Sequence, residues 1–149
     1  MIIIRNAKSE DAPAIIDFQL KMAWETEKMT LNPETVTKGV YAIFDNHSRG
    51  EYYVAETESR VVASLLITYE WSDWRNCNVW WFQSVYVVPD YRRQGIFRKM
   101  YTFIKSKVEE VGAAGLRLYV ETKNIRAKRT YEALGMNSEH YSFYEWMRE

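Results

Sequence analysis

The stretch from Trp80 to Met100, WWFQSVYVVPDYRRQGIFRKM, begins as an apolar strand, passes through a basic turn and continues as an amphipathic helix. Pro89 has no N–H and disfavours helix in the residue before it, so we expect the strand to end near Val88. Gly95 lets the backbone approach a ligand closely because it carries no Cβ. Free N–H groups and the positive end of a helix bind anions at a helix start. The stretch therefore predicts an anion site at the beginning of this helix.

Composition indicates one folded domain spanning residues 1–149. Hydrophobic residues make up 47% and aromatic residues 15% of the chain, which is typical of a protein with a packed core. The 20 basic and 20 acidic residues cancel. This balance argues against a protein that binds nucleic acid or an anionic membrane by bulk charge, and we expect neither partner.

The numbers and positions of cysteine and histidine argue against disulfide bonds and metal sites. The single Cys77 excludes an internal disulfide, and we expect it to be a small buried side chain. His47 and His140 lie far apart without partners at ligand spacing, so no zinc site is predicted. The apolar run at the N-terminus is too short for a signal peptide or a membrane anchor, so we expect a soluble, cytoplasmic protein.

The periodicity of apolar residues and the positions of capping residues, proline and glycine predict ten helices and strands along the chain. Ser9 and Asn32 are expected to cap the first two helices, and Gly135 to end the last one. The segments 24–29 and 70–76 are expected to be loops or frayed ends. Strands are predicted at 2–5, 52–56, 61–69, 78–88, 116–120 and 141–147, and helices at about 9–23, 32–44, 96–111 and 124–134.

This order, β-α-α-β-β-β-α-β-α-β, predicts an α/β fold with a mixed sheet covered by helices on both faces. The strands on either side of the helix at 96–111 are expected to be parallel, which places a ligand at the carboxyl ends of the strands.

The segment from Val85 to Ile96 resembles the acetyl-CoA-binding segment of the GNAT acetyltransferase superfamily. That pattern is a V-x-x-P strand end followed by Q/R-x-x-G-x-G/A. Arg92, Gly95 and Phe97 occupy its three fixed positions, and Phe97 departs from the expected Gly or Ala. This departure leaves open whether Phe97 points away from the cofactor or reshapes its channel.

A second GNAT signature, N-x-x-A-x-x-x-Y-x-x-x-G, is matched on the last predicted helix by Asn124, Ala127, Tyr131 and Gly135. The predicted element order is also that of the GNAT fold, so the resemblance covers essentially the whole chain. It implies an acetyl-CoA-dependent N-acetyltransferase.

The resemblance implies that backbone N–H groups of the turn surround the pyrophosphate of acetyl-CoA and that arginine side chains contact its phosphates. A solvated helix start is the alternative for these arginines. The strand backbone is implied to pair with the pantetheine arm. The residues implied to bind the cofactor are Val85, Val87, Arg92, Arg93, Gln94, Gly95, Ile96, Phe97, Arg98, Asn124, Ala127 and Tyr131.

The same resemblance implies catalytic roles for Val87, whose N–H would stabilise the oxyanion, and for Tyr131, which would protonate the departing thiolate. A tyrosine is protonated at neutral pH, as an acid must be. The alternative for Tyr131 is simple packing on an amphipathic helix.

The general base is not settled by the sequence, because Gln83 stands where many GNAT members have a glutamate. Glu27 and Glu70 are the two carboxylates that we place in the catalytic set, and a proton relay through water is the alternative. Further carboxylates in the segments expected at the acceptor side are Glu25 and Asp73. Together these acids favour a cationic acceptor.

Four tryptophans, Trp71, Trp74, Trp80 and Trp81, are close in sequence. Packing in the core or at a subunit interface explains them most simply, and an aromatic wall around an ammonium ion is the alternative.

We predict an N-acetyltransferase that transfers an acetyl group to a primary amine of a small cationic molecule by direct attack in a ternary complex. The alternative is a catalytically silent acyl-CoA-binding sensor, favoured by Gln83 and Phe97. A homodimer is compatible with both functions. A nucleic-acid binder that uses the basic patch at 92–99 is disfavoured by the zero net charge.

Overall fold

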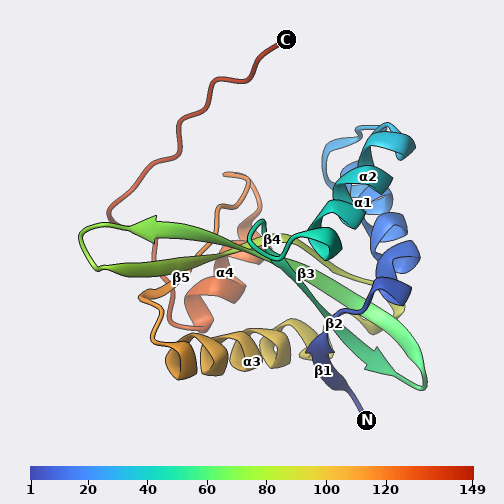
Figure 1. Cartoon of the computed structure of the whole chain (residues 1–149), viewed down its shortest axis with the longest axis horizontal. Coiled ribbons are helices and arrows are strands. Elements are labelled where there is room, and N and C mark those ends of the chain that lie inside the picture. Colours follow the sequence, from blue (N-terminus) through green and yellow to red (C-terminus); the bar gives the residue numbers. More distant parts are fainter. The chain divides into compact units, whose positions relative to one another are not determined.

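The computed structural model describes residues 1–149, which form two compact units, Met1–Arg117 and Leu118–Glu149. The first unit contains all the strands and three of the four α-helices (Figure 1). Short 3-10 turns at Ser9–Asp11 and Pro89–Tyr91 precede helices. The elements are β1 (Ile3–Asn6), α1 (Ala12–Glu27), α2 (Pro33–Asp45), β2 (Glu51–Thr57), β3 (Arg60–Ser72), β4 (Cys77–Val87), α3 (Ile96–Val111), β5 (Gly115–Arg117) and α4 (Ile125–Ala133).

The five strands form one mixed sheet in the order β1-β2-β3-β4-β5. Strands β1 to β4 pair with one another in antiparallel fashion, and β5 pairs with β4 in parallel through Val79, Trp80 and Trp81. The parallel pair flanks α3 in the sequence, as predicted. The α/β fold class with a mixed sheet is therefore confirmed.

Alternate residues of β2 show that helices of the first unit cover both faces of the sheet. Tyr52 and Val54 pack in a cluster with α1 and α2. Tyr53, which lies between them, makes an edge contact with Phe103 of α3 at 6.0 Å between ring centroids. Because successive side chains of a strand point to opposite faces, α1 and α2 cover one face and α3 the other (Figure 1).

The prediction that Ser9 caps the first helix is wrong. The Asp11 carboxylate accepts a hydrogen bond from the Lys8 N–H at 2.7 Å, whereas the Ser9 hydroxyl bonds only to the side chain of Glu10. A 3-10 turn at Ser9–Asp11 precedes α1, and the bond from Lys8 to Asp11 belongs to this turn, whereas no side chain caps α1 itself.

The next helix, α2, begins as predicted. The Asn32 side chain accepts a hydrogen bond from the Thr35 N–H at 3.1 Å, and Pro33 is the first helical residue.

Two predicted loops are parts of regular elements. Helix α1 continues to Glu27, so Trp24 and Glu25 are helical. Strand β3 continues to Ser72, so Glu70 and Trp71 are strand residues. In both cases the polar residues form the exposed end of an element that continues beyond the boundary predicted from the sequence.

The second unit contains α4 and the C-terminal segment. The predicted strand at 141–147 is wrong, because the segment after α4 makes no strand ladder. Its apolar side chains are exposed, from 58% for Phe143 to 92% for Tyr144. Alternation of apolar and polar residues is compatible with a strand, but a strand also needs a neighbour for its backbone hydrogen bonds. The strand predicted at 116–120 is also shorter and ends at Arg117.

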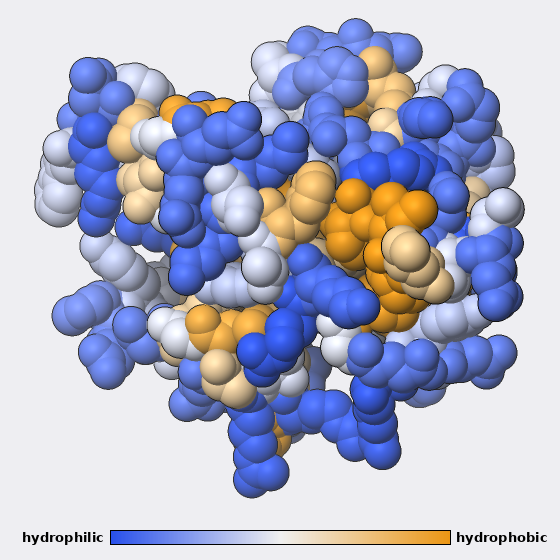
Figure 2. Space-filling view, turned by 90° about the horizontal axis from the view of Figure 1, so that it is seen from below, coloured by the Kyte–Doolittle hydropathy of each residue, from blue (hydrophilic) through white to orange (hydrophobic).

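The surface is largely hydrophilic on the face shown in Figure 2, with smaller apolar patches between charged and polar side chains. None of the helices has the length and apolar character that crossing a membrane requires.

Candidate active site

A β-bulge in β4 changes the direction of its side chains. Gln83 lies opposite Leu66 of β3, but Tyr86 lies opposite Ser64, so β4 carries one extra residue between these two pairs. Ser84 takes a left-handed conformation there, with φ of 52°. A bulge of this kind re-aims the side chains that follow it.

Because of the bulge, the side chains of Phe82 and Tyr86, on either side of Ser84, point to opposite faces of the sheet. Phe82 packs against Tyr101 of α3 at 5.9 Å between ring centroids. Tyr86 instead contacts Phe18 of α1 at 5.1 Å. Without the extra residue these two β4 side chains would share one face of the sheet.

Strand β4 also extends beyond its parallel partner. The β4–β5 ladder ends at the pair of Trp81 and Arg117, whereas β4 continues to Val87. On the side of β4 that faces β5, the backbone of residues 82–87 is therefore left without a strand partner, and this part includes Val85 and Val87. Unpaired strand backbone offers N–H and C=O groups to an extended ligand that contains amides.

The turn between β4 and α3 has the backbone of an anion site. After the 3-10 turn Pro89–Tyr91, Arg93 and Gly95 both take left-handed conformations, with φ of 63° and 77°. The first helical hydrogen bond of α3 runs from the Lys99 N–H to the Gly95 carbonyl at 3.1 Å. The N–H groups before Lys99 point out of the positive end of the helix, where an anion is favoured.

The side chain of Arg92 is directed away from this helix start. Its Nε donates a hydrogen bond to the Val87 carbonyl at 2.7 Å, and its Nη2 donates to the carboxylate of Glu25 at 2.8 Å. Arg93 and Arg98 are exposed on the turn and on the first turn of α3. The predicted charge-assisted contacts to phosphate therefore suit Arg93 and Arg98 better than Arg92.

Phe97 packs against the sheet side of α3. Its ring lies 5.9 Å from that of Phe82 and 6.4 Å from that of Tyr101. The side chain is half-buried in this aromatic group. A bulky residue at this motif position is thus accommodated by packing within the first unit.

The remaining predicted residues lie on α4, in the second unit. Asn124 caps this helix, because its side chain accepts a hydrogen bond from the Ala127 N–H at 3.0 Å. Gly135 has a φ of 95°, and the Met136 N–H closes the helix on the Tyr131 carbonyl at 3.1 Å. Tyr131 is half-buried, and burial raises the pKa of its hydroxyl. Three of the four motif residues thus have a structural role in forming and ending α4.

Comparison with known proteins agrees with both motifs. The model of the acetyltransferase (GNAT) family matches residues 16–136. The chain belongs to the acetyltransferase (GNAT) family. Thialysine N-epsilon-acetyltransferase of Bos taurus is 30% identical over 145 residues, which is 90% of this chain and 83% of that protein. As a member of the family with such relatives, the protein is an N-acetyltransferase.

Solved structures share the GNAT fold. A possible acetyltransferase from Clostridium difficile 630 has a TM-score of 0.93 at 43% identity, covering 100% of this chain and 99% of its own. AAC(6')-Iy, solved in complex with the bisubstrate analogue CoA-S-monomethyl-acetylneamine, has a TM-score of 0.81 at 12% identity and covers 99% of both chains. At that identity the likeness concerns the fold alone.

Two of the four carboxylates considered as the base of this GNAT enzyme are held in ion pairs. Glu70 accepts hydrogen bonds from Trp81 Nε1 at 2.9 Å and from Arg117 Nη1 at 2.8 Å, and these bonds lower the pKa of Glu70. Glu25 is paired with Arg92. Glu27 is exposed at the end of α1, and Asp73 is exposed in the β3–β4 turn.

Gln83 lies on β4 just before the bulge. Its side-chain amide donates to the Thr68 hydroxyl at 3.4 Å, a long hydrogen bond across the β3–β4 pair.

The tryptophans fall into two groups. Trp80 is buried, as core packing predicts, and Trp81 is half-buried. Trp71 and Trp74, near the β3–β4 turn, are 62% and 88% exposed, so core packing does not explain them.

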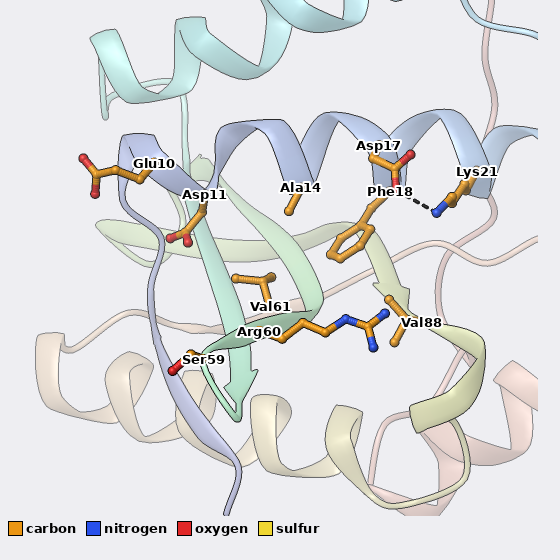
Figure 3. A pocket seen from close by; sticks show the side chains of 10 residues that line it. All are labelled: Glu10, Asp11, Ala14, Asp17, Phe18, Lys21, Ser59, Arg60, Val61 and Val88. Carbon is orange, nitrogen blue, oxygen red and sulfur yellow. Dashed lines mark ion pairs between the residues drawn. The ribbon is translucent and has the colours of Figure 1, made fainter.

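A cleft of about 420 Å³ lies between α1 and the β2–β3 turn (Figure 3). Both charged and apolar side chains line it, among them the ion pair of Asp17 and Lys21 at 2.8 Å. None of the site residues predicted from the sequence lines it. The cleft and the predicted cofactor turn are therefore different places on the first unit.

Three residues of the site region were not predicted from the sequence. Ser84 forms the bulge, Tyr86 reaches the end of α1, and Arg117 holds Glu70. The only sequence signal for any of them is the polar Ser84 inside an apolar strand, and a serine there does not by itself indicate a bulge.

Proposed function

We propose that this enzyme uses acetyl-CoA and transfers the acetyl group to a primary amine of a small cationic molecule, by direct attack in a ternary complex. The observation that carries the proposal is the turn between β4 and α3. Left-handed residues at Arg93 and Gly95 precede a helix start with open N–H groups. Such a turn suits the pyrophosphate of CoA.

The proposed contacts to the cofactor lie mainly on β4, on the start of α3 and on the turn between them. The backbone of Gln94, Gly95, Ile96 and Phe97 is proposed to hold the pyrophosphate, with Arg93 and Arg98 adding charge. The backbone of β4 at Val85 and Val87, which has no strand partner on the side of β5, is proposed to pair with the pantetheine arm. AAC(6')-Iy, of the same fold, has been solved with an analogue that contains CoA, which supports CoA as the cofactor. On α4, Asn124 and Ala127 retain a proposed role in binding alongside their role in capping.

Acetyl-CoA supplies the thioester carbonyl that the amine attacks, forming the C–N bond while the C–S bond breaks. The Val87 N–H is proposed to donate a hydrogen bond to the carbonyl oxygen as negative charge develops there. The Tyr131 hydroxyl is proposed to give its proton to the departing sulfur and to regain one from solvent. A tyrosine hydroxyl is protonated at neutral pH, as an acid must be, and burial raises the pKa of Tyr131 further.

The proton lost by the amine needs an acceptor. Glu70 was one of the two predicted bases, but its lowered pKa and its bonds to Trp81 and Arg117 make it a weak one. We therefore place Glu27, or water beside it, in this role. Glu27 is exposed at the end of α1.

Support for a small cationic acceptor comes from a relative and from exposed aromatic side chains. The Bos taurus relative is named for the ε-amine of thialysine. Trp24, Trp71 and Trp74 are exposed, and aromatic faces attract ammonium groups.

The test measures release of free CoA thiol from acetyl-CoA with a panel of amines: thialysine, lysine, polyamines, an aminoglycoside and peptide N-termini. The proposal predicts thiol release that depends on one class of small amine, together with an acetylated product detected by mass spectrometry. Saturable binding of acetyl-CoA without turnover on any amine would favour the silent sensor instead. No binding of acetyl-CoA would contradict the proposed function altogether.

A further inference from the structure

Glu25 joins three parts of the first unit. It lies in the last turn of α1, and its carboxylate accepts a hydrogen bond from Arg92 Nη2 at 2.8 Å and another from the Tyr86 hydroxyl at 3.1 Å. Tyr86 belongs to β4 and Arg92 to the turn that follows it. The end of α1 is therefore tied to the strand and to the turn at the same time.

Arg92 is held on three sides. Besides its bond to Glu25, it donates from Nε to the Val87 carbonyl at 2.7 Å, and its guanidinium lies 5.3 Å from the centre of the Tyr86 ring. These contacts use the guanidinium for internal bonds, so a phosphate contact would require some of them to break. The carbonyl that it fixes belongs to the last residue of β4.

The bulge at Ser84 makes this arrangement possible. It turns Tyr86 toward α1, where the ring packs on Phe18 and the hydroxyl reaches Glu25. Burial favours the neutral form of the Glu25 carboxyl, but the hydrogen bonds from Arg92 and Tyr86 outweigh it and lower its pKa. Glu25 is thus an ionised partner of Arg92 and is poorly suited to accept a proton from the acceptor amine.

We propose that Glu25 is a positioning residue for the cofactor turn, which holds Arg92 against the Val87 carbonyl and so fixes the end of β4 in the conformation that binds acetyl-CoA. This inference rests on the proposed function, because it assumes that the cofactor binds along β4 and the turn. Holding the turn in its bound conformation in advance lowers the entropic cost of binding.

The inference is tested by calorimetric titration of acetyl-CoA into the wild type, Glu25→Gln, Arg92→Gln and the double variant. Glu25→Gln keeps the size of the side chain and removes its charge. We expect it to weaken acetyl-CoA binding about tenfold. Because Glu25 acts through Arg92, adding Glu25→Gln to Arg92→Gln is expected to cause no further loss.

Asp17→Asn is the matched control, because it also removes one carboxylate and one ion pair from α1. We expect it to bind acetyl-CoA like the wild type. In steady state, Glu25→Gln is expected to raise the KM for acetyl-CoA and to leave kcat nearly unchanged. A purely structural role would lower the unfolding temperature without changing the affinity of the folded protein.

Two results would overturn the positioning role and leave the proposed function intact. One is wild-type affinity for acetyl-CoA in Glu25→Gln. The other is a double variant whose fold-loss of affinity equals the product of the losses in the two single variants. Failure of the wild type to bind acetyl-CoA would overturn both.

Discussion

Phe82 and Tyr86 lie on the same strand, an even number of residues apart, yet their side chains point to opposite faces of the sheet. Phe82 packs on Tyr101 of α3, and Tyr86 packs on Phe18 of α1. The bulge at Ser84 separates them. This relationship brings Tyr86 to the end of α1 and leaves Phe82 in the core beneath α3.

We expect a β-branched residue at position 84 to destabilise the bulge. Ser84 has a φ of 52°, which costs a β-branched side chain much more than it costs glycine. We predict that Ser84→Val lowers the free energy of unfolding by about 1–3 kcal/mol and weakens acetyl-CoA binding. Ser84→Gly, the control, should keep both close to wild type. Urea denaturation and calorimetry measure the two quantities, and a fully stable Ser84→Val would contradict the role given to the bulge.

Replacing Phe97 by alanine restores the residue that the GNAT motif expects at this position. Because the ring packs on Phe82 and Tyr101, we predict that Phe97→Ala lowers the free energy of unfolding by about 1–3 kcal/mol. The affinity for acetyl-CoA should stay close to wild type. A large change in affinity with unchanged stability would instead show that Phe97 shapes the cofactor channel.

Tyr131 is expected to act as an acid. We predict that Tyr131→Phe lowers kcat about 100-fold and leaves the KM for acetyl-CoA unchanged. Burial raises the pKa of Tyr131 above its ordinary value of 10.0, and the acid form is lost only as pH rises through that pKa. The loss of kcat at high pH should therefore lie above pH 10.0 in the wild type. An unchanged kcat in the variant would remove Tyr131 from the mechanism.

The N-terminal part of the fold contains an ion pair that should make stability depend on pH. Asp11 is buried and accepts bonds from Arg5 at 2.8 and 3.1 Å. Burial would raise the pKa of Asp11, but the bonds from Arg5 and Lys8 lower it below its ordinary value of 3.8. This contribution is therefore present above pH 3.8 and is lost as pH falls through the lowered pKa.

We predict that Asp11→Asn lowers the free energy of unfolding by about 2 kcal/mol at neutral pH. The difference from wild type should shrink as the pH falls below 3.8. Denaturation at several pH values measures it, with Glu10→Gln as the control at the neighbouring exposed position. A difference that persists unchanged in acid would show that the charge of Asp11 is not its cause.

Local sequence signals predicted much of the fold and of the cofactor turn. Pro89 ended β4, Asn32 capped α2, and α3 began directly after Gly95. These features depend on the backbone limits of single residues, so they can be recognised without knowledge of the tertiary structure.

Features that depend on distant parts of the chain were not predicted. The bond between Glu25 and Arg92 joins residues 67 positions apart, and no local sequence pattern predicts it. The bulge at Ser84 contains no glycine to signal it. The segment 141–147 has the alternation of a strand, yet alternation does not supply the neighbour that a strand needs.

Acetyl-CoA is proposed to bind at the turn between β4 and α3. This binding is tested by the dissociation constant of acetyl-CoA, measured by calorimetry for Gly95→Val and Gly95→Asn beside the wild type. Gly95 has a φ of 77°, which asparagine tolerates and valine does not. We predict saturable binding in the wild type and in Gly95→Asn, and a loss of at least about tenfold in a folded Gly95→Val. Equal affinity in all three, or no binding in the wild type, would contradict this proposal.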